Sequence, residues 1–303
     1  ARRGSGRRLG VVGAGCTRGH LPARVPPSRA RGLCARGGSG VPAGAAGVDP
    51  AVEHETIAEV GPLGRKVVSA YLAGHNFDVV RNPKVHVRID DARHFVETTR
   101  EKFDAITSDP LDPWVKGAAM LYTVEFFQMA KDHLNEGGVV TLFVQLYESN
   151  MAAVKSEIGT FLEVFPNGVV WGNTNEGKGY DLVLLGQKGT TRIDVDAIQA
   201  KLQRPEYAPM KKSLQEIGMS SAVDLFSTYA GRKRDLEPWL SDVMLNRDKN
   251  LRLQYLAGLG LNLYQADVIY ADMLKHVTRL PDDLFIATPE TKTALFAAIT
   301  RAQ

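Results

Sequence analysis

The spacing of apolar side chains from about Glu55 onward predicts alternating strands and helices. Apolar runs typical of strands occur at 55–60, 85–89, 103–108 and 139–145. Between them, apolar side chains recur at helical spacing over 64–73, 92–99 and 123–134, the last closed by a glycine pair at 137–138. Strands separated by helices form a parallel sheet with helices on both faces. We therefore expect a doubly wound, Rossmann-like α/β fold.

The pattern changes after a predicted helix at about 151–164. Two strands, 168–172 and 180–186, are joined by a polar loop too short to hold a crossover helix, so this pair is antiparallel. A parallel sheet that ends in an antiparallel hairpin is typical of the S-adenosylmethionine-dependent methyltransferase type. Residues 189–303 have the spacing of helices and contain no catalytic constellation. We expect an α/β domain over 54–188 followed by a helical C-terminal extension.

Residues 1–53 have a different composition, dominated by Arg, Gly, Pro and Ala. Such a segment buries too little apolar surface to offset the entropy lost on ordering. Arg without Lys is also what a GC-rich gene produces when it is read out of frame. A disordered linker and an out-of-frame segment both predict an irregular structure for 1–53.

Charge and cysteine content narrow the class of protein. The net charge is +3, but nine Arg and no acid lie in residues 1–48, which leaves 28 basic and 34 acidic side chains in the remainder. An acidic domain is a poor candidate for nucleic-acid binding. Cys16 and Cys34 lack metal-site spacing, so we expect no metal and a reduced, cytoplasmic setting. The sequence has no run of 18 apolar residues.

Two features suggest a nucleoside site. Residues 9–15 are an apolar run that leads into Gly13 and Gly15, where the backbone could approach a nucleoside closely, although a chance match is about equally plausible in a glycine-rich region. Glu59 ends the next predicted strand, where an acid in doubly wound folds accepts hydrogen bonds from ribose hydroxyls. A solvated acid at a strand end is the alternative.

Asp90, Asp91 and Ala92 follow the strand at 85–89. Ligands of open α/β sheets bind at the carboxyl ends of the strands, so an acid here could accept the amino group of adenine. One of these acids could equally cap the helix that follows.

The strand at 103–108 leads into Asp109-Pro110-Leu111-Asp112-Pro113. Two carboxylates in a rigid loop suit a cationic amine. Asp-Pro pairs also form ordinary turns, which would explain either acid alone.

At this point the chain resembles the spermidine synthase family. The resemblance runs from about Glu55 to Gly186 and rests on motifs in family order: Asp90-Asp91-Ala92-Arg93, the 109–113 loop, Leu121-Tyr122 with the following acidic and aromatic helix, 136–139 and Gln145. Residues 114–117 are similar to a bacterial branch in which the synthase follows a membrane domain. The family's β-hairpin domain and its Tyr-Pro pair are missing, with Tyr180 an approximate stand-in.

The resemblance implies transfer of an aminopropyl group from decarboxylated S-adenosylmethionine, a co-substrate, to a diamine, without a cofactor. Asp109 would be the catalytic base, and Asp112, Gln145 and Tyr122 would bind the amine. The nucleoside would be held by the glycines and the strand-end residues described above: Gly13, Gly15, Glu59, Asp90, Asp91 and Ala92. A homodimer, a preceding membrane domain and tethering to the inner membrane face are further expectations.

Two other functions fit the same pattern. One is a methyltransferase that uses S-adenosylmethionine itself, although the carboxylate of that molecule would lie badly against Asp109 and Asp112. The other is a catalytically silent domain that binds polyamine or nucleoside and belongs to a membrane protein.

Overall fold

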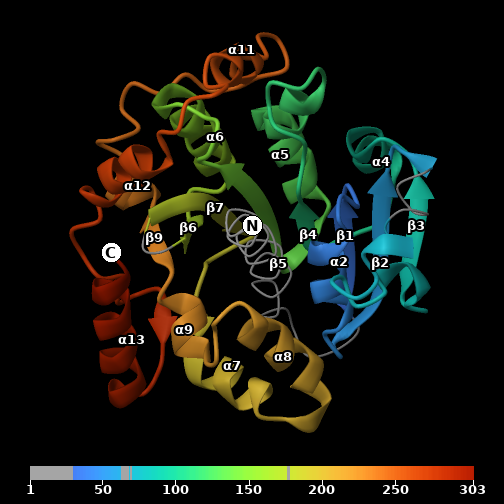
Figure 1. Ribbon diagram of the computed structural model, residues 1–303, viewed down its shortest axis with the longest axis vertical. Coiled ribbons are helices and arrows are strands. Elements are labelled where there is room, and N and C mark those ends of the chain that lie inside the picture. The colour runs from blue at the N-terminus through green and yellow to red at the C-terminus, as the bar shows by residue number, and fades with distance from the viewer. Residues whose placement is uncertain (1–29, 63–67, 69, 176–177) are drawn as a thin grey trace.

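The computed structural model describes residues 30–62, 68, 70–175 and 178–303, and its centre is an eight-stranded sheet (Figure 1). The strand order is β3-β2-β1-β4-β5-β7-β6-β9. These strands are β1 (Ala30–Ala35), β2 (Val52–Glu59), β3 (Val85–Ile89), β4 (Phe103–Ser108), β5 (Leu134–Gln145), β6 (Val169–Asn175), β7 (Lys178–Gln187) and β9 (Tyr229–Arg232). A separate short pair consists of β8 (Ile193–Asp194) and β10 (Phe285–Ile286).

The doubly wound fold is confirmed. Strands β1 to β5 pair in parallel, whereas β7 pairs antiparallel with both β5 and β6. Strands β3 and β4 begin and end at the predicted residues. Helix α5 ends at Asp132, and the predicted closing glycines instead belong to β5, which begins at Leu134. Half of the residues of the helix expected at 64–73 lie outside the described residues.

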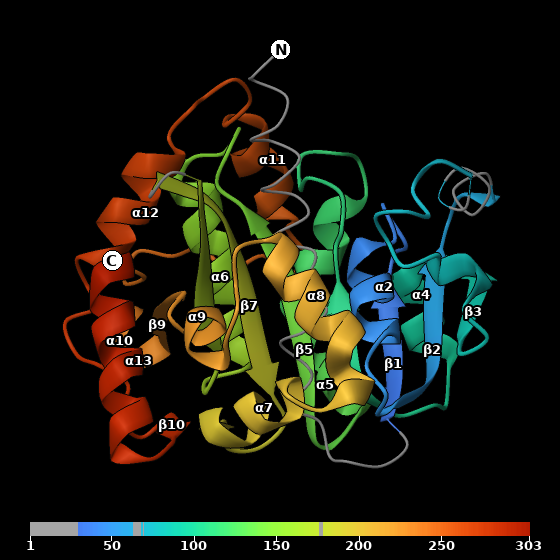
Figure 2. The same ribbon diagram turned by 60° about the horizontal axis from the view of Figure 1, so that its bottom comes forward.

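Helices cover both faces of the sheet (Figures 1 and 2). On one face α4 (Ala92–Thr98), α5 (Val124–Asp132) and α6 (Met151–Val164) pack over the main hydrophobic core, which α11 (Arg252–Gly258) and α12 (Ala266–Leu274) extend. The other face carries α2 (Val41–Gly47), α7 (Val195–Leu202), α8 (Ala208–Glu216), α9 (Ala222–Phe226) and α13 (Pro289–Ala302). Helix α10 (Lys233–Leu236) follows β9. Within the described ranges, no helix combines the length and apolar character needed to cross a bilayer.

The expectation of an irregular segment up to residue 53 is wrong for residues 30–47. Strand β1 lies in the middle of the parallel sheet, between β2 and β4, and α2 packs against it. The small residues of α2 are a packing solution, because a Cβ on Gly44 would collide with the backbone carbonyl of Asn76. A composition without large apolar residues is therefore compatible with an ordered, close-packed βα unit here.

The C-terminal extension after residue 188 is mainly helical, as expected, and it also contributes strands. Strand β9 pairs antiparallel with β6 and is the eighth strand of the main sheet. A second core joins this region to the hairpin: Trp171 of β6 packs its ring against Phe226, Tyr229 and Phe285. The C-terminal region is thus continuous with the α/β domain.

Candidate active site

The polar residues singled out in the described sequence lie at one edge of the sheet, where the parallel strands end. The strand order reverses between β1 and β4, since β2 and β3 lie to one side and β5 to the other. Open α/β sheets bind ligands at this switch point because the loops diverge there. The loops after β1 to β5, together with the start of antiparallel β7, build the candidate site.

The loop after β1, Arg36–Gly40, supplies the glycine-rich turn. Gly40 has φ +76° and stands directly before α2. A Cβ there would lie 2.9 Å from Nδ2 of Asn76 and 3.0 Å from methyl groups of Val68 and Val79, so only glycine fits without rearrangement. Gly13 and Gly15 lie outside the described residues, and the place the sequence analysis gave them, ahead of Glu59, is taken by this loop.

Glu59 ends β2 beside that loop, as predicted. Its Oε2 accepts a hydrogen bond from the amide of Gly37 at 3.1 Å, and its Oε1 accepts one from Gly61 at 3.0 Å. Two backbone donors fix the carboxylate while leaving each oxygen with acceptor capacity. Glu59 and the glycines also line a small pocket with Ile57. This arrangement can accept hydrogen bonds from a diol such as ribose.

The two acids after β3 have different surroundings. Asp91 caps α4, since its side chain accepts from the amides of Arg93 and His94. Asp90 is held at the same edge by its amide, which donates to the Glu59 carbonyl at 3.1 Å, and its carboxylate lies 2.8 Å from Nδ1 of His94. The capping alternative is therefore correct for Asp91. The Ala92 side chain is buried against Ala35 and Ala58.

The loop after β4 carries Asp109 and Asp112 next to the glycine loop. A Cβ on Gly38 would lie 3.8 Å from Oδ2 of Asp109, which shows that this carboxylate faces the β1 loop. Burial, followed by nearby Glu148, raises the pKa of Asp112, and Arg36 opposes this shift. A cation bound beside Asp112 would favour its charged form.

Tyr122 lies beneath this loop. Its hydroxyl donates to the Leu111 carbonyl at 3.4 Å, and only 2% of the residue is exposed. The structure therefore shows Tyr122 supporting the loop that carries both aspartates, and direct contact with an amine stays a prediction.

The opposite wall of the site comes from β5, its following residues and β7. Gln145 ends β5, is 3% exposed and pairs in register with Asp181 of β7, which is fully buried and accepts from Nδ2 of Asn173 at 2.9 Å. The rings of Tyr147 and Tyr180 lie 4.9 Å apart. Burial, then the charge of Asp181, raises the pKa of Tyr147, which keeps this phenol neutral. Acids and aromatic rings together suit an alkyl ammonium ion.

Glu157 of α6 adds a buried carboxyl behind Asp112. It is 1% exposed, and neither of its oxygens has a hydrogen-bond partner among the described residues. Burial, then repulsion from Asp112, raises its pKa. The part of the candidate site around Asp112 therefore contains more carboxyl groups than a neutral ligand would require.

Sequence reasoning missed part of this site. Tyr147 and Glu148 directly follow the predicted strand at 139–145, so the rule that placed Asp109 could have found them. Asp181 gave no such signal, because its position depends on the register between β5 and β7. The glycine loop was missed because β1 was not predicted.

The fold is that of a doubly wound α/β protein with a candidate site at the switch point of its sheet. A spermidine synthase in complex with the transition-state analogue AdoDATO has the same fold, with a TM-score of 0.57 at 20% identity over 73% of this chain and 74% of that chain. Residues 50–170 match the sequence model of the spermine/spermidine synthase domain. This part of the chain is therefore similar to that family.

Two bacterial proteins are similar to this chain over part of their length. Polyamine aminopropyltransferase 1 of Pseudomonas aeruginosa is 30% identical over 175 residues, which is 52% of this chain and 60% of the relative. Polyamine aminopropyltransferase of Pseudomonas syringae pv. tomato is 33% identical over 132 residues, or 42% of this chain and 46% of the relative. The similarity thus spans about half the length of these relatives.

Proposed function

We propose that this protein transfers the aminopropyl group of decarboxylated S-adenosylmethionine to a diamine, forming a longer polyamine and methylthioadenosine. The observation that carries the proposal is the loop with Asp109 and Asp112, which stands between a glycine loop with its strand-end acid, Glu59, and a wall of acids and tyrosines. The names of the two bacterial relatives support the same reaction.

The chemistry requires positioning and one proton transfer. The amine nitrogen attacks the propyl carbon next to sulfur, a new C–N bond forms, and the C–S electron pair returns to the sulfonium. The leaving group is then neutral, so no acid is needed to protonate it. The nucleophile must lose a proton because an ammonium ion has no lone pair, and a nearby carboxylate can accept it.

The residues divide these tasks. Glu59 and Asp90 hold the nucleoside beside the Arg36–Gly40 loop, with Asp91 and Ala92 shaping the turn that presents Asp90. Asp109 faces that loop and is the proposed base. Asp112 and Gln145 bind the amine, whose charge is matched by the surrounding acids.

Product analysis with purified protein tests the proposal. Decarboxylated and intact S-adenosylmethionine are each supplied with putrescine, and spermidine and methylthioadenosine are measured by mass spectrometry. We expect both products only from the decarboxylated form. Methyl transfer from the intact form, or neither product under any condition, would contradict the proposal.

Two substitutions assign the carboxylates. Asp109→Asn should lower kcat by roughly 10²–10⁴, the contribution of a general base, with little change in the amine KM. Asp112→Asn should mainly raise the amine KM, since it removes a charge partner present before and during the reaction. Asp282→Asn is a matched control, because its side chain is 77% exposed and pairs only with Lys292 in the ion pairs described. Equal effects of all three substitutions would refute the assignment.

The assembly and location of the protein are proposals of the same kind. A homodimer, and a cytoplasmic domain tethered to a membrane through a preceding segment, follow from the family resemblance. Light scattering of the purified chain tests the first, and fractionation of cells that express the whole gene tests the second.

A further inference from the structure

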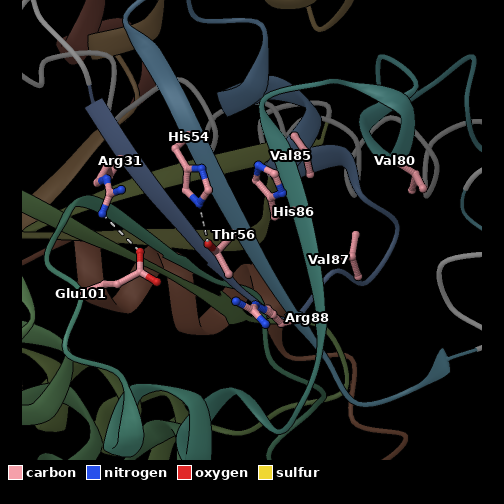
Figure 3. A pocket seen from close by; sticks show the side chains of 9 residues that line it. All are labelled: Arg31, His54, Thr56, Val80, Val85, His86, Val87, Arg88 and Glu101. Atoms are coloured by element: carbon pink, nitrogen blue, oxygen red, sulfur yellow. Dashed lines mark hydrogen bonds and ion pairs between the residues drawn. The ribbon is translucent and has the colours of Figure 1, made fainter.

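A second pocket lies away from the proposed transfer site, along β1, β2 and β3 (Figure 3). Its volume of about 510 Å³ falls within the roughly 300–1,000 Å³ of small-molecule sites. Five polar side chains from the strands, and one acid that precedes β4, line it: Arg31, His54, Thr56, His86, Arg88 and Glu101. Figure 3 shows these side chains on one face of the strands, with Val85 and Val87 directed away from them.

The strand register explains why these side chains converge. Arg31 of β1 pairs with His54 of β2, and Thr56 of β2 pairs with His86 of β3. Alternate residues of a strand share a face, so Arg88 follows His86 on the same side. The imidazoles of His54 and His86 are stacked with their centroids 4.5 Å apart. The short α4 packs over the other end of this face, against Ala35 and Ala58.

The charge of this pocket contrasts with the acidic remainder of the chain. Arg31 is paired with Glu101 at 3.3 Å, whereas Arg88 is exposed and has no ion pair or hydrogen bond among the described residues. The two histidines add positive charge when they are protonated. Only two imidazoles are present, and no set of three metal-ligating side chains occurs within the described ranges. The pocket therefore suits an anion better than a metal ion.

We propose that this pocket is an anion site that binds the phosphate groups of a small polyphosphate ligand. Guanidinium groups bind phosphate through paired N–H donors, and imidazoles supply further donors. Arg31, His54 and Arg88 come from three adjacent strands, so a ligand with more than one phosphate can contact all three. This inference does not depend on the transfer reaction.

Anion binding here should be coupled to pH. Burial, then nearby His86 and Arg31, lowers the pKa of His54, while Glu101 opposes the shift and Arg88 adds to it. A bound phosphate reverses the balance, because it favours the charged imidazole. Affinity should therefore rise as pH falls through the His54 titration, and binding should take up protons.

Calorimetry on the full chain tests the site with pyrophosphate, ATP and inorganic phosphate as probes. We expect pyrophosphate and ATP to bind more tightly than inorganic phosphate. Arg88→Gln should weaken both by about tenfold, the usual effect of losing one charge-assisted contact. Glu101→Gln should tighten both, since it frees Arg31 and removes a negative charge, and general loss of structure cannot produce that result. Arg301→Gln is the control, because this exposed residue belongs to α13 at the opposite end of the sheet (Figure 1).

The pH dependence is tested by measuring the affinities of wild type and His54→Gln at about pH 6 and pH 8. Titration of the ligand itself affects both proteins equally and so does not contribute to the difference between them. Wild type should gain more affinity on acidification than the variant. If ATP and pyrophosphate bind with similar affinity, the ligand is a free polyphosphate. If ATP binds more tightly than pyrophosphate and Arg88→Gln still weakens ATP binding, the ligand is a nucleotide. No pyrophosphate binding at either pH, unchanged affinity in Arg88→Gln, or a loss for ATP alone would overturn the phosphate site.

Discussion

Replacing Gly40 with Ala is the most direct test of the β1–α2 unit. The residue has φ +76°, and Ala in the left-handed region costs about 1–2 kcal/mol. The new Cβ would also lie 2.9–3.0 Å from side chains of Asn76, Val68 and Val79. Overpacking of this kind costs about 1–3 kcal/mol. Gly40→Ala should therefore lower the free energy of unfolding by about 2–5 kcal/mol.

Gly117→Ala is the matched control. Gly117 has φ +88°, and a Cβ there would meet no atom within 4 Å. This variant should lose only the backbone contribution of about 1–2 kcal/mol. Urea unfolding followed by circular dichroism gives both values, and their difference isolates the packing contribution. Equal losses would mean that the glycine loop does not pack against Asn76 as described, and the assignment of 36–40 as the nucleotide loop would fail with it.

Four further outcomes are expected. Glu59→Ala should weaken methylthioadenosine binding by about 1–3 kcal/mol in calorimetry, and an unaltered Kd would remove the residue from the site. Burial raises the pKa of Glu157, so at pH values above the usual Glu range this carboxyl is still protonated in the native state but ionised in the unfolded chain. The free energy of unfolding therefore declines as pH rises above that range. Glu157→Gln should flatten this slope, by at most about 1.4 kcal/mol per pH unit in urea titrations, and an unchanged slope would refute the cause. Because the pKa of Asp112 is raised, this carboxylate gains a proton at pH values above the usual Asp range, and the amine KM should increase as pH falls through them. This pH dependence of KM must be absent in Asp112→Asn. Asn246→Ala should cost about 3 kcal/mol or more in thermal unfolding, because its buried amide group bonds to the carbonyls of Ala119 and Tyr122, and a loss below 1 kcal/mol would show that these bonds are dispensable.

Most of the sheet could be predicted because burial imposes a period on its strands. Strands β2 to β7 and helix α6 carry dense apolar residues, and their boundaries shifted by a few residues at most, apart from the earlier start of β5 at Leu134. The antiparallel hairpin followed from a loop too short for a crossover. These are local properties that the chain shows without knowledge of its neighbours.

Strand β1 could not be recognised in the same way. It is buried between two strands, but its residues include Arg31 and Gly32, and it adjoins an Arg-rich stretch. The composition of the whole segment concealed a short ordered part. In α2 the absence of large apolar residues reflects the close approach of Asn76 to Gly44, which only the folded chain reveals.

The site was predictable where a residue follows its strand and was missed where it depends on pairing. Glu59, Asp109 and Asp112 stand at strand ends. Asp181 reaches the same edge only because β7 runs antiparallel to β5. Assigning it from sequence would require the register of a long-range pair.

The eighth strand has a consequence for work with parts of this chain. Without the residues that follow β7, strand β6 would present an unpaired backbone edge, and Trp171 would lose the rings of Phe226 and Tyr229. Open edges next to exposed apolar surface template intermolecular pairing. A fragment that stops after β7 at Gln187 contains the whole family match, yet it should aggregate during purification, so the smallest usable unit must extend through the C-terminal helices.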